Sequence, residues 1–259
     1  MKILKIIYLY FLNSLQIHLA SPVVFVMFFL SKIFRFGLFI VFLYFLGSSL
    51  VSVGDYSVSQ LVLFYLIFNL VDTAAQMLFR EVYRFRPLII SGGFDLVLTK
   101  PFPTLLRVLV GGPDFIDLGI LLVLLAVIAY TLAVHVRPDP VSLLIFILLL
   151  INSLILAAAF HIFVLGFGIL TLSVDHLVMI YRDFTALMRI PVDFFPGTLR
   201  ALLTFVVPVG IMFPFPAKAL LALLDWPLIF IALSLGLLAL FLSLRFWNFA
   251  LKHYQSASS

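Results

Sequence analysis

Five polar or charged side chains interrupt the first two long apolar runs of the chain. Lys32 and Arg35 stand three residues apart in the first run, whereas Asn69, Asp72 and Gln76 follow at spacings of three and four in the second. Each spacing places its residues on one face of a helix. An unpaired charge inside a membrane costs roughly 2.5–3.5 kcal/mol on insertion scales, so these side chains need partners.

Depth along the two runs indicates which partners meet. At about 1.5 Å of rise per residue, Lys32 lies roughly 15 Å and Asp72 roughly 12 Å from the same end. We therefore expect Asp72 to form a structural salt bridge with Lys32 or Arg35. The alternatives are a charged lining of a translocation path, or a first run that starts later and lets Lys32 and Arg35 snorkel to the membrane surface.

A third group of charges lies in residues 171–190, where Asp175, Arg182, Asp183 and Arg189 are mixed with apolar residues. This mixture is typical of a protein-facing span that lines a cavity, or of an extended helix at the membrane surface with solvated charges. We interpret it as a protein-facing span, in which Arg182 and Asp183 belong to the intramembrane charges.

Motifs for enzyme chemistry do not occur in the sequence. His161 and His176 are fifteen residues apart with no Glu or Cys nearby, so we expect packing histidines and no metal site. The sequence contains no HExxH, GxSxG or paired-carboxylate motif and no GxxxxGK[ST] phosphate loop. We expect no cofactor, no enzymatic activity and no ATP hydrolysis on this chain. Its energy must come from a partner or an ion gradient.

Composition indicates the class of protein. Of the 259 residues, 65% are hydrophobic and 10% charged, and the mean hydropathy is +1.30; soluble domains have roughly 45–50% apolar and about 25% charged residues. The net charge of +5 comes mostly from residues at the ends of apolar runs, where they set topology and do not indicate nucleic-acid binding. The absence of cysteine excludes disulfides. We expect an all-α polytopic protein of the bacterial cytoplasmic membrane.

The first 20 residues predict an amphipathic helix that lies on the membrane, because Lys2, Lys5, Asn13 and Gln16 fall near one stripe. A cleaved signal peptide is the alternative, but the stripe interrupts the apolar stretch and no A-x-A-like site follows. Six predicted spans then follow: about Pro22–Leu46, Val58–Phe79, Phe115–Val134, Val141–Leu165, Thr171–Ile190 and Trp226–Phe246.

Basic residues indicate the orientation of these spans. Five Lys or Arg lie in residues 80–112, and Lys2, Lys5, Arg245 and Lys252 join them on the same side of a six-span topology. The first turn on the other side, residues 47–57, has none, and the second has only Arg137. Basic loops stay in the cytoplasm, so we expect both termini to be cytoplasmic, although Arg200 and Lys218 weaken the bias.

Two irregular segments separate the spans. Residues 80–112 are basic and rich in Gly and Pro, which predicts a cytoplasmic loop and a docking surface; Glu81, the only Glu, is expected to cap or pair with Arg84. Residues 191–221 contain five prolines, which forbid one uninterrupted helix, yet much of the segment is too apolar for a loop. We expect short re-entrant helices that form a gate or pathway wall, unless the prolines only break helices.

Three stretches resemble one known family. GGFDLVLTKP (Gly92–Pro101) is similar to the segment that follows the second span in ABC-2 type transporter permeases. The Pro-rich block from Arg189 to Leu221 resembles the outward-facing re-entrant region of that family, and FWNFALKHYQSASS (Phe246–Ser259) resembles the closing signature of a six-span bacterial subfamily. The resemblance implies an exporter permease that dimerises with itself or a related permease and pairs with two ATP-binding subunits.

In such permeases the segment after the second span carries a coupling helix that receives the motion of the ATPase. The resemblance therefore implies an ATPase contact in which a small turn lets residues 94–98 enter a groove on the partner. The residues concerned are Gly92, Gly93, Phe94, Asp95, Leu96, Leu98 and Pro101. Without the resemblance, Gly92 and Gly93 are simple turn residues.

Two other classes of protein remain as alternatives. A secondary transporter driven by an ion gradient is expected to show inverted repeats and acidic coupling residues near mid-membrane; no convincing repeat is present, and Asp72 is taken as the only such residue in the first four spans. A non-transporting scaffold does not explain the Pro-rich segment. The sequence does not identify the cargo, and only Lys32 and Arg35 point to an anionic or lipid-like one.

Overall fold

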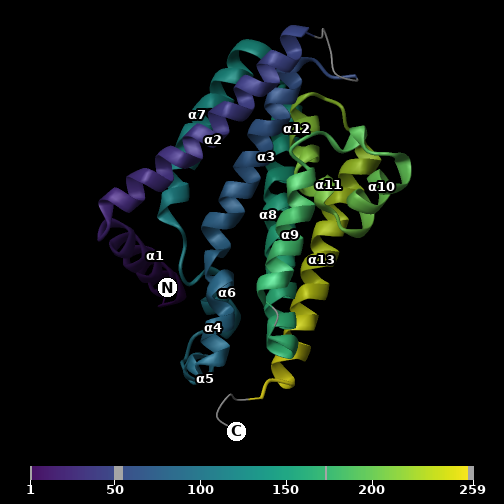
Figure 1. The fold of residues 1–259 in the computed structure, drawn as a ribbon. Helices are drawn as coiled ribbons and strands as arrows, with labels where there is room; N and C mark the ends of the chain where they lie inside the picture. Colours follow the sequence, from purple (N-terminus) through teal and green to yellow (C-terminus); the bar gives the residue numbers. More distant parts are fainter. Residues whose placement is uncertain (1, 50–54, 173, 256–259) are drawn as a thin grey trace.

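The computed structural model describes residues 2–49, 55–172 and 174–255, and it is a bundle of long helices with shorter helices at both ends (Figure 1). The chain is 84% helical, and no strand occurs in the described ranges, which confirms the all-α class. In chain order the helices are α1 (Lys2–Leu19), α2 (Pro22–Ser49), α3 (Val58–Phe79), η1 (Arg80–Arg84), α4 (Phe85–Ile90), α5 (Gly93–Leu98), α6 (Thr104–Val110), α7 (Phe115–Thr131), η2 (Leu132–Val136), α8 (Pro140–Thr171), α9 (Val174–Leu187), η3 (Val192–Phe194), α10 (Gly197–Ala201), η4 (Leu202–Val206), α11 (Val209–Met212), α12 (Pro214–Leu220) and α13 (Trp226–Lys252).

Five of the described helices are long and apolar enough to cross a membrane: α2, α3 with its continuation to Ile90, α7 with η2, α8 and α13. They confirm a multi-pass membrane protein and match five of the six predicted spans, each starting within one residue of the prediction. We call the end of the bundle that carries α4–α6 and the last turn of α13 the α5 end, and the opposite end the α12 end (Figure 1). Residues 50–54 of the first predicted outer turn and residues 256–259 of the closing signature lie outside the described residues.

Local chemistry explains where the spanning helices begin. Ser57 caps α3 in a reciprocal arrangement, because its hydroxyl accepts the Gln60 backbone N–H (3.3 Å) while the Gln60 side chain accepts the Ser57 N–H (2.9 Å). Asp114 accepts the N–H of the second helical residue of α7 at 3.0 Å. At α8, Asp139 accepts two backbone N–H groups (2.9 and 3.1 Å) ahead of Pro140 in the first turn.

Helices α8 and α13 make the most extensive helix–helix contact of the bundle. Asn152 of α8 donates a side-chain hydrogen bond to the Ala232 carbonyl of α13 (3.0 Å). One turn further, a Cβ on Gly236 would lie 1.9 Å from the Asn152 side-chain oxygen, so only glycine permits this approach. A polar side chain inside the bundle is thereby satisfied by a neighbouring helix, as the low dielectric of such a site requires.

The predicted fifth span is wrong as a single helix. α9 covers Val174–Leu187, 14 residues, or about 21 Å at 1.5 Å per residue, and this is short of the roughly 30 Å of a bilayer core. It is not among the five helices that pass as spans. The helix ends shortly before Pro191, because the residue that precedes a proline disfavours the α conformation.

The chain nevertheless passes along the whole of α3 in this region. At the α5 end Asp175 of α9 pairs with Arg86 (3.1 Å), and at the α12 end Asp193 accepts a hydrogen bond from the hydroxyl of Tyr56 (2.7 Å), which precedes α3. α9 and the irregular residues 188–190 together connect the α5 end to the α12 end, as one helix was expected to do.

The Pro-rich segment forms a hairpin, which we call the proline hairpin (residues 197–220). Its arms, Gly197–Val206 and Val209–Leu220, are bent by 80° at Pro208. Asp193 joins the outer ends of both arms, because it pairs with Lys218 (2.7 Å) and lies 3.9 Å from Arg200. The two ends therefore lie close together at the α12 end.

Candidate functional site: the coupling segment and the charged residues beside α3

The coupling segment turns sharply between α4 and α5. Gly92 has φ +71°, in the left-handed region that side chains rarely adopt, and a Cβ on Gly93 would lie 3.0 Å from the Leu88 side chain. The first glycine is thus required by backbone conformation and the second by close packing. This turn lets α5 fold back against the bundle.

Phe94 is fully buried, with 0% of its surface exposed. Its ring meets Tyr254 edge-on (centroids 5.0 Å apart) and Phe85 edge-on (5.2 Å), and Phe85 in turn contacts Trp247 of α13 (6.4 Å). The expectation that Phe94 enters a groove on another protein is therefore wrong, because this side chain instead fixes α5 to the end of α13. The contact was not readable from the sequence, since its two sides are 160 residues apart.

The outer face of the turn and of α5 is apolar. Leu96 is 67% exposed, Ile90 54% and Leu98 36%, and Pro101 is also exposed. Asp95 is half-buried beside the chain end, where burial and the Asp95 carboxylate raise the pKa of Tyr254. Of the predicted contact residues, Leu96, Leu98 and Pro101 are thus accessible to a partner.

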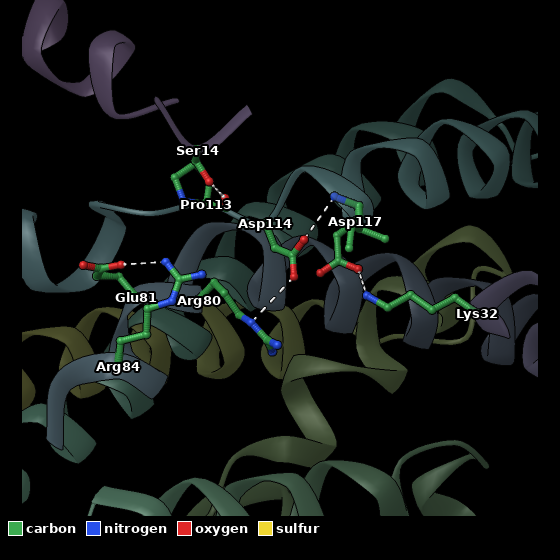
Figure 2. Close-up of polar contacts among 9 residues, drawn as sticks. Ser14, Lys32, Arg80, Glu81, Arg84, Pro113, Asp114 and Asp117 are labelled. Carbon is green, nitrogen blue, oxygen red and sulfur yellow. Dashed lines mark hydrogen bonds and ion pairs between the residues drawn. The ribbon is translucent and has the colours of Figure 1, made fainter. Parts of the chain in front are cut away.

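Most basic residues of the segment are neutralised within the fold. Glu81 pairs with Arg107 (2.5 Å). Figure 2 shows its pair with Arg84 (3.4 Å), which confirms the expected Glu81–Arg84 pair, and Arg80 3.6 Å from Asp114. Arg86 pairs with Asp175 of α9, as described above. Lys100 is exposed and has no ion pair in the described part of the chain. The positive charge of this segment is therefore largely structural.

α1 packs on the junction between α6 and α7. The Ser14 hydroxyl donates to the Pro113 carbonyl (Figure 2), and the Tyr10 ring lies under the Arg107 guanidinium (5.0 Å) and edge-on to Phe102 (5.8 Å). The predicted polar stripe lies on the other side, where Lys5, Asn13 and Gln16 are exposed; the Lys2 side chain lies outside the described residues. A helix is thus present at the predicted place, and its side with Tyr10 and Ser14 holds the end of the coupling segment; its position on the membrane stays a prediction.

Lys32 pairs with Asp117 of α7, not with Asp72 (Figure 2). The Asp117 side chain is 2% exposed and that of Lys32 is 28% exposed. The expected Lys32–Asp72 salt bridge is wrong, and Asp72 is not the only acidic residue in the first four spans. The sequence held a signal for Asp117, because Asp114 and Asp117 repeat the spacing of three that singled out Lys32 and Arg35.

Depth alone does not decide between Asp72 and Asp117 as the partner of Lys32. The Asp114 backbone N–H donates to the Met77 carbonyl of α3 (3.1 Å), which places the start of α7 beside residue 77. Asp72 is five residues away, or about 7.5 Å along α3. Asp117 and Asp72 therefore lie at similar depth, and α2 carries Lys32 and Arg35 in its third and fourth turns.

Asp72 lies in a polar stripe of α3 that faces α2 and α9. It accepts a hydrogen bond from the Gln76 side chain (2.6 Å), and no ion pair joins it to any residue within the described ranges. Arg35 of α2 and Arg189, just after α9, line a cavity of about 70 Å³ together with Asn69 and Asp72. A second, smaller cavity connects Asp72 and Arg35 to the Lys32–Asp117 pair.

Arg182 belongs to this group and Asp183 does not. The positive charges of Arg182 and Arg35 both act on the Asp72 carboxylate. Asp183 follows Arg182 at about 100° around α9, on the exposed outer side of the helix, and it forms no ion pair with a described residue. The structure thus joins four of the five predicted intramembrane charges, Lys32, Arg35, Asp72 and Arg182, and adds Asp117 and Arg189.

His161 of α8 is a packing residue, as expected. It is buried, its Nδ1 lies 2.7 Å from the Ala157 carbonyl, and its ring contacts Phe79 (5.0 Å) and Tyr181 (4.9 Å). His176 is exposed on α9. The two histidines do not form a common site.

Comparison with known proteins identifies a family for this chain. No curated protein and no solved structure matches it. A family model described as ABC-2 family transporter protein matches residues 33–258, which include the coupling segment, the charged residues beside α3 other than Lys32, and the proline hairpin. The chain therefore belongs to the ABC-2 family of transporter proteins, the membrane permeases of ABC transporters.

Proposed function

We propose that this chain is the permease subunit of an ATP-driven exporter in the bacterial cytoplasmic membrane. It works with a separate ATP-binding subunit and a second copy of itself or of a related permease. Membership of the ABC-2 family implies the ATP-binding partner. The sequence contains no phosphate-binding loop, which supports a division of labour in which the partner hydrolyses ATP.

The ATPase contacts the outer face of the α4–α5 turn. Exposed leucine and isoleucine side chains at a polar end of a membrane protein are candidates for a protein contact, and Leu96 is the most exposed of them at 67%. The surrounding end is polar, because Arg84, Arg86 and Lys100 are all exposed there. This exposed apolar face on a helix whose other side is locked in place carries the proposal.

The locked side of α5 transmits motion to α13. Phe94 packs between Phe85 and Tyr254, and Phe85 packs on Trp247, so a force on α5 acts directly on the last turns of α13. That helix is bound along its length to α8. A push from the ATPase therefore moves α13 and α8 against α3, which carries the polar stripe.

The orientation follows from the basic residues. The α5 end carries Lys100 and the paired arginines of residues 80–107, which supports a cytoplasmic location for this end and for both termini. The proline hairpin then enters the membrane from the outer side and returns, as a gate above the polar stripe. Its backbone breaks at Pro208 need protein or water as partners.

Replacement of an exposed leucine by aspartate tests the ATPase contact. The tagged permease is purified from its native membrane, and retained ATP hydrolysis is measured for the wild type, Leu96→Asp and Leu223→Asp. Leu223 is the matched control, because it is an exposed leucine at the α12 end. We expect Leu96→Asp to lose at least nine tenths of the ATPase and Leu223→Asp to retain it. Full retention in Leu96→Asp would refute the α5 contact, and no ATPase with the wild type would refute the permease proposal.

The lack of cysteine makes a topology test direct. Single-cysteine variants Thr99→Cys at the α5 end and Ser59→Cys at the α12 end place one exposed thiol at each end. In intact cells we expect a membrane-impermeant maleimide to label Ser59→Cys and to spare Thr99→Cys. The reverse pattern would overturn the proposed orientation.

A further inference from the structure

Three arginines surround the polar stripe of α3 without a carboxylate partner. Arg35, Arg182 and Arg189 are exposed, and none of their guanidinium groups forms a hydrogen bond or an ion pair with any residue that the structure describes. The basic residues of the coupling segment differ, since all but Lys100 are paired. Arginine keeps its charge at any depth in a membrane, so these three side chains need a counter-charge from outside the chain.

The nearby carboxylates do not supply enough negative charge. Asp117 is occupied by Lys32 and Asp175 by Arg86. The charge of Arg182 acts on the Asp72 carboxylate and Arg189 lines the cavity beside it, whereas Asp183 points about 100° away from Arg182. Among the described residues Asp72 is the one carboxylate beside these arginines that has no ion pair, which leaves an excess of two positive charges.

The cavity between Arg35 and Arg189 has room for a small acidic group. Its volume is about 70 Å³, several times the roughly 10–15 Å³ that admits one water molecule. Aromatic rings of Phe39, Tyr65 and Phe68 form its other walls. A phosphate or a carboxylate fits such a space, but a large ligand does not.

The surface beside the cavity is apolar and open. Leu38 and Phe42 lie three and seven residues after Arg35, on the same side of α2, and both are more than half exposed. An apolar chain attached to an acidic group in the cavity therefore finds a matching surface along α2. Arginine guanidinium groups, a small cavity and an apolar helix surface therefore lie next to one another.

We propose that Arg35 and Arg189, assisted by Arg182, bind the acidic group of an amphiphilic anion, such as a phosphate or carboxylate on an apolar chain. Planar guanidinium groups bind both oxygens of such an acid at once. On the proposed function, on which the assignment as cargo rests, this anion is the class of substrate that the permease moves. The binding itself does not depend on the ATPase.

Binding of a soluble probe tests the site. The probe is dihexanoyl phosphatidic acid, and dihexanoyl phosphatidylcholine is the neutral control; both are titrated onto the full chain in a non-ionic detergent. We expect the acid to bind and the double variant Arg35→Gln/Arg189→Gln to raise its Kd at least tenfold. Arg245→Gln is the control for an exposed arginine elsewhere, on α13, and leaves the Kd within twofold.

A variant with the opposite sign excludes simple loss of folding. Asp72→Asn removes the only negative charge that faces the arginines, so we expect its Kd for phosphatidic acid to fall severalfold. Equal binding of both probes, or an unchanged Kd in the double arginine variant, would overturn the proposal. A wild-type preparation without ATPase would leave this result intact and would remove only the assignment as cargo.

The source of the acidic group is resolved by two readouts on the same site. If a resident membrane lipid supplies it, native mass spectrometry of the purified wild type detects a bound anionic phospholipid that is depleted in the double variant. If cargo supplies it, phosphatidic acid stimulates ATP hydrolysis of the purified complex at least twofold, and the double variant is not stimulated. Either pattern supports the site, and the absence of both contradicts it.

Discussion

The coupling segment and the surface beside α3 are both rich in arginine, but they treat its charge differently. In the coupling segment Glu81 alone neutralises Arg84 and Arg107, and carboxylates of α7 and α9 neutralise Arg80 and Arg86. Beside α3, Lys32 is the one basic residue with a carboxylate partner, Asp117, among the described residues. An arginine without a partner at membrane depth is costly to the fold, and on our proposal its counter-charge comes from a ligand.

The largest expected effect comes from the buried ion pair at the edge of the two regions. Asp117→Leu leaves the Lys32 ammonium without its partner, and breaking a buried pair in this way costs about 3 kcal/mol. We expect the double variant Lys32→Met/Asp117→Leu to recover most of this loss, because neither charge remains. Unfolding in detergent measures both, and a double variant no more stable than Asp117→Leu would contradict the pairing.

Glu81→Gln is expected to have the next largest effect. The substitution keeps the size of the side chain but removes the charge that balances Arg84 and Arg107, and we expect a loss of about 1–2 kcal/mol for this partly buried group. Asp183→Asn is the control, because Asp183 is exposed and has no ion pair with a described residue. We expect it to change stability by less than about 0.5 kcal/mol. Equal effects at the two positions would remove the distinction between paired and unpaired charges.

Asp193 adds a pH-dependent contribution at the α12 end. Burial would raise its pKa, but hydrogen bonds from Lys218 and Tyr56 and the charges of Lys218 and Arg200 outweigh burial and lower the pKa. Its stabilising effect is therefore full above the ordinary value of 3.8 and is lost as the pH falls through the lowered value.

Hydrogen exchange of residues 197–220 checks this contribution. We expect Asp193→Asn to weaken protection of the proline hairpin at pH 7 by about 1 kcal/mol, the scale of one charge-assisted hydrogen bond. The difference from the wild type should shrink as the pH falls below 3.8 and disappear below the lowered pKa. A difference that grows as the pH falls would have the wrong sign for this account.

The smallest effect separates the two kinds of arginine most clearly. Arg35→Met removes an unpaired charge, so we expect no loss of stability and a gain of up to about 1 kcal/mol. Arg86→Met removes half of an ion pair whose two side chains are exposed, and this costs about 0.2–1 kcal/mol. Opposite signs in thermal unfolding are the expected outcome, and a larger loss for Arg35→Met would show that it has an internal partner.

The sequence predicted the helices better than the contacts between them. The bounds of the second span, Val58–Phe79, were correct because the Ser57–Gln60 cap and an unbroken apolar run mark them locally. The fifth span was wrong because its charges and the approach to Pro191 end the helix early. Periodicity reports which residues share a face, and by that means it placed Asn69, Asp72 and Gln76 together on one side of α3.

Long-range contacts explain the remaining errors in the candidate site. Lys32 meets Asp117 because α7 starts level with Met77 of α3, and the depth of a helix start is set by packing that a single run does not encode. Phe94 is buried by Tyr254, which lies 160 residues later. The burial of Phe94 therefore depends on where Tyr254, which follows α13, packs.

The central claim is that the outer face of α5 receives the ATP-binding subunit, and a site-specific crosslink tests it most directly. A photoreactive benzoylphenylalanine replaces Leu96, or Leu122 on the exposed side of α7 as control, in cells that contain the native partner. We predict a crosslink from position 96, and none from position 122, to a protein that also binds a radiolabelled azido-ATP analogue. A complex that forms normally but gives no crosslink to that protein from position 96 would contradict the account.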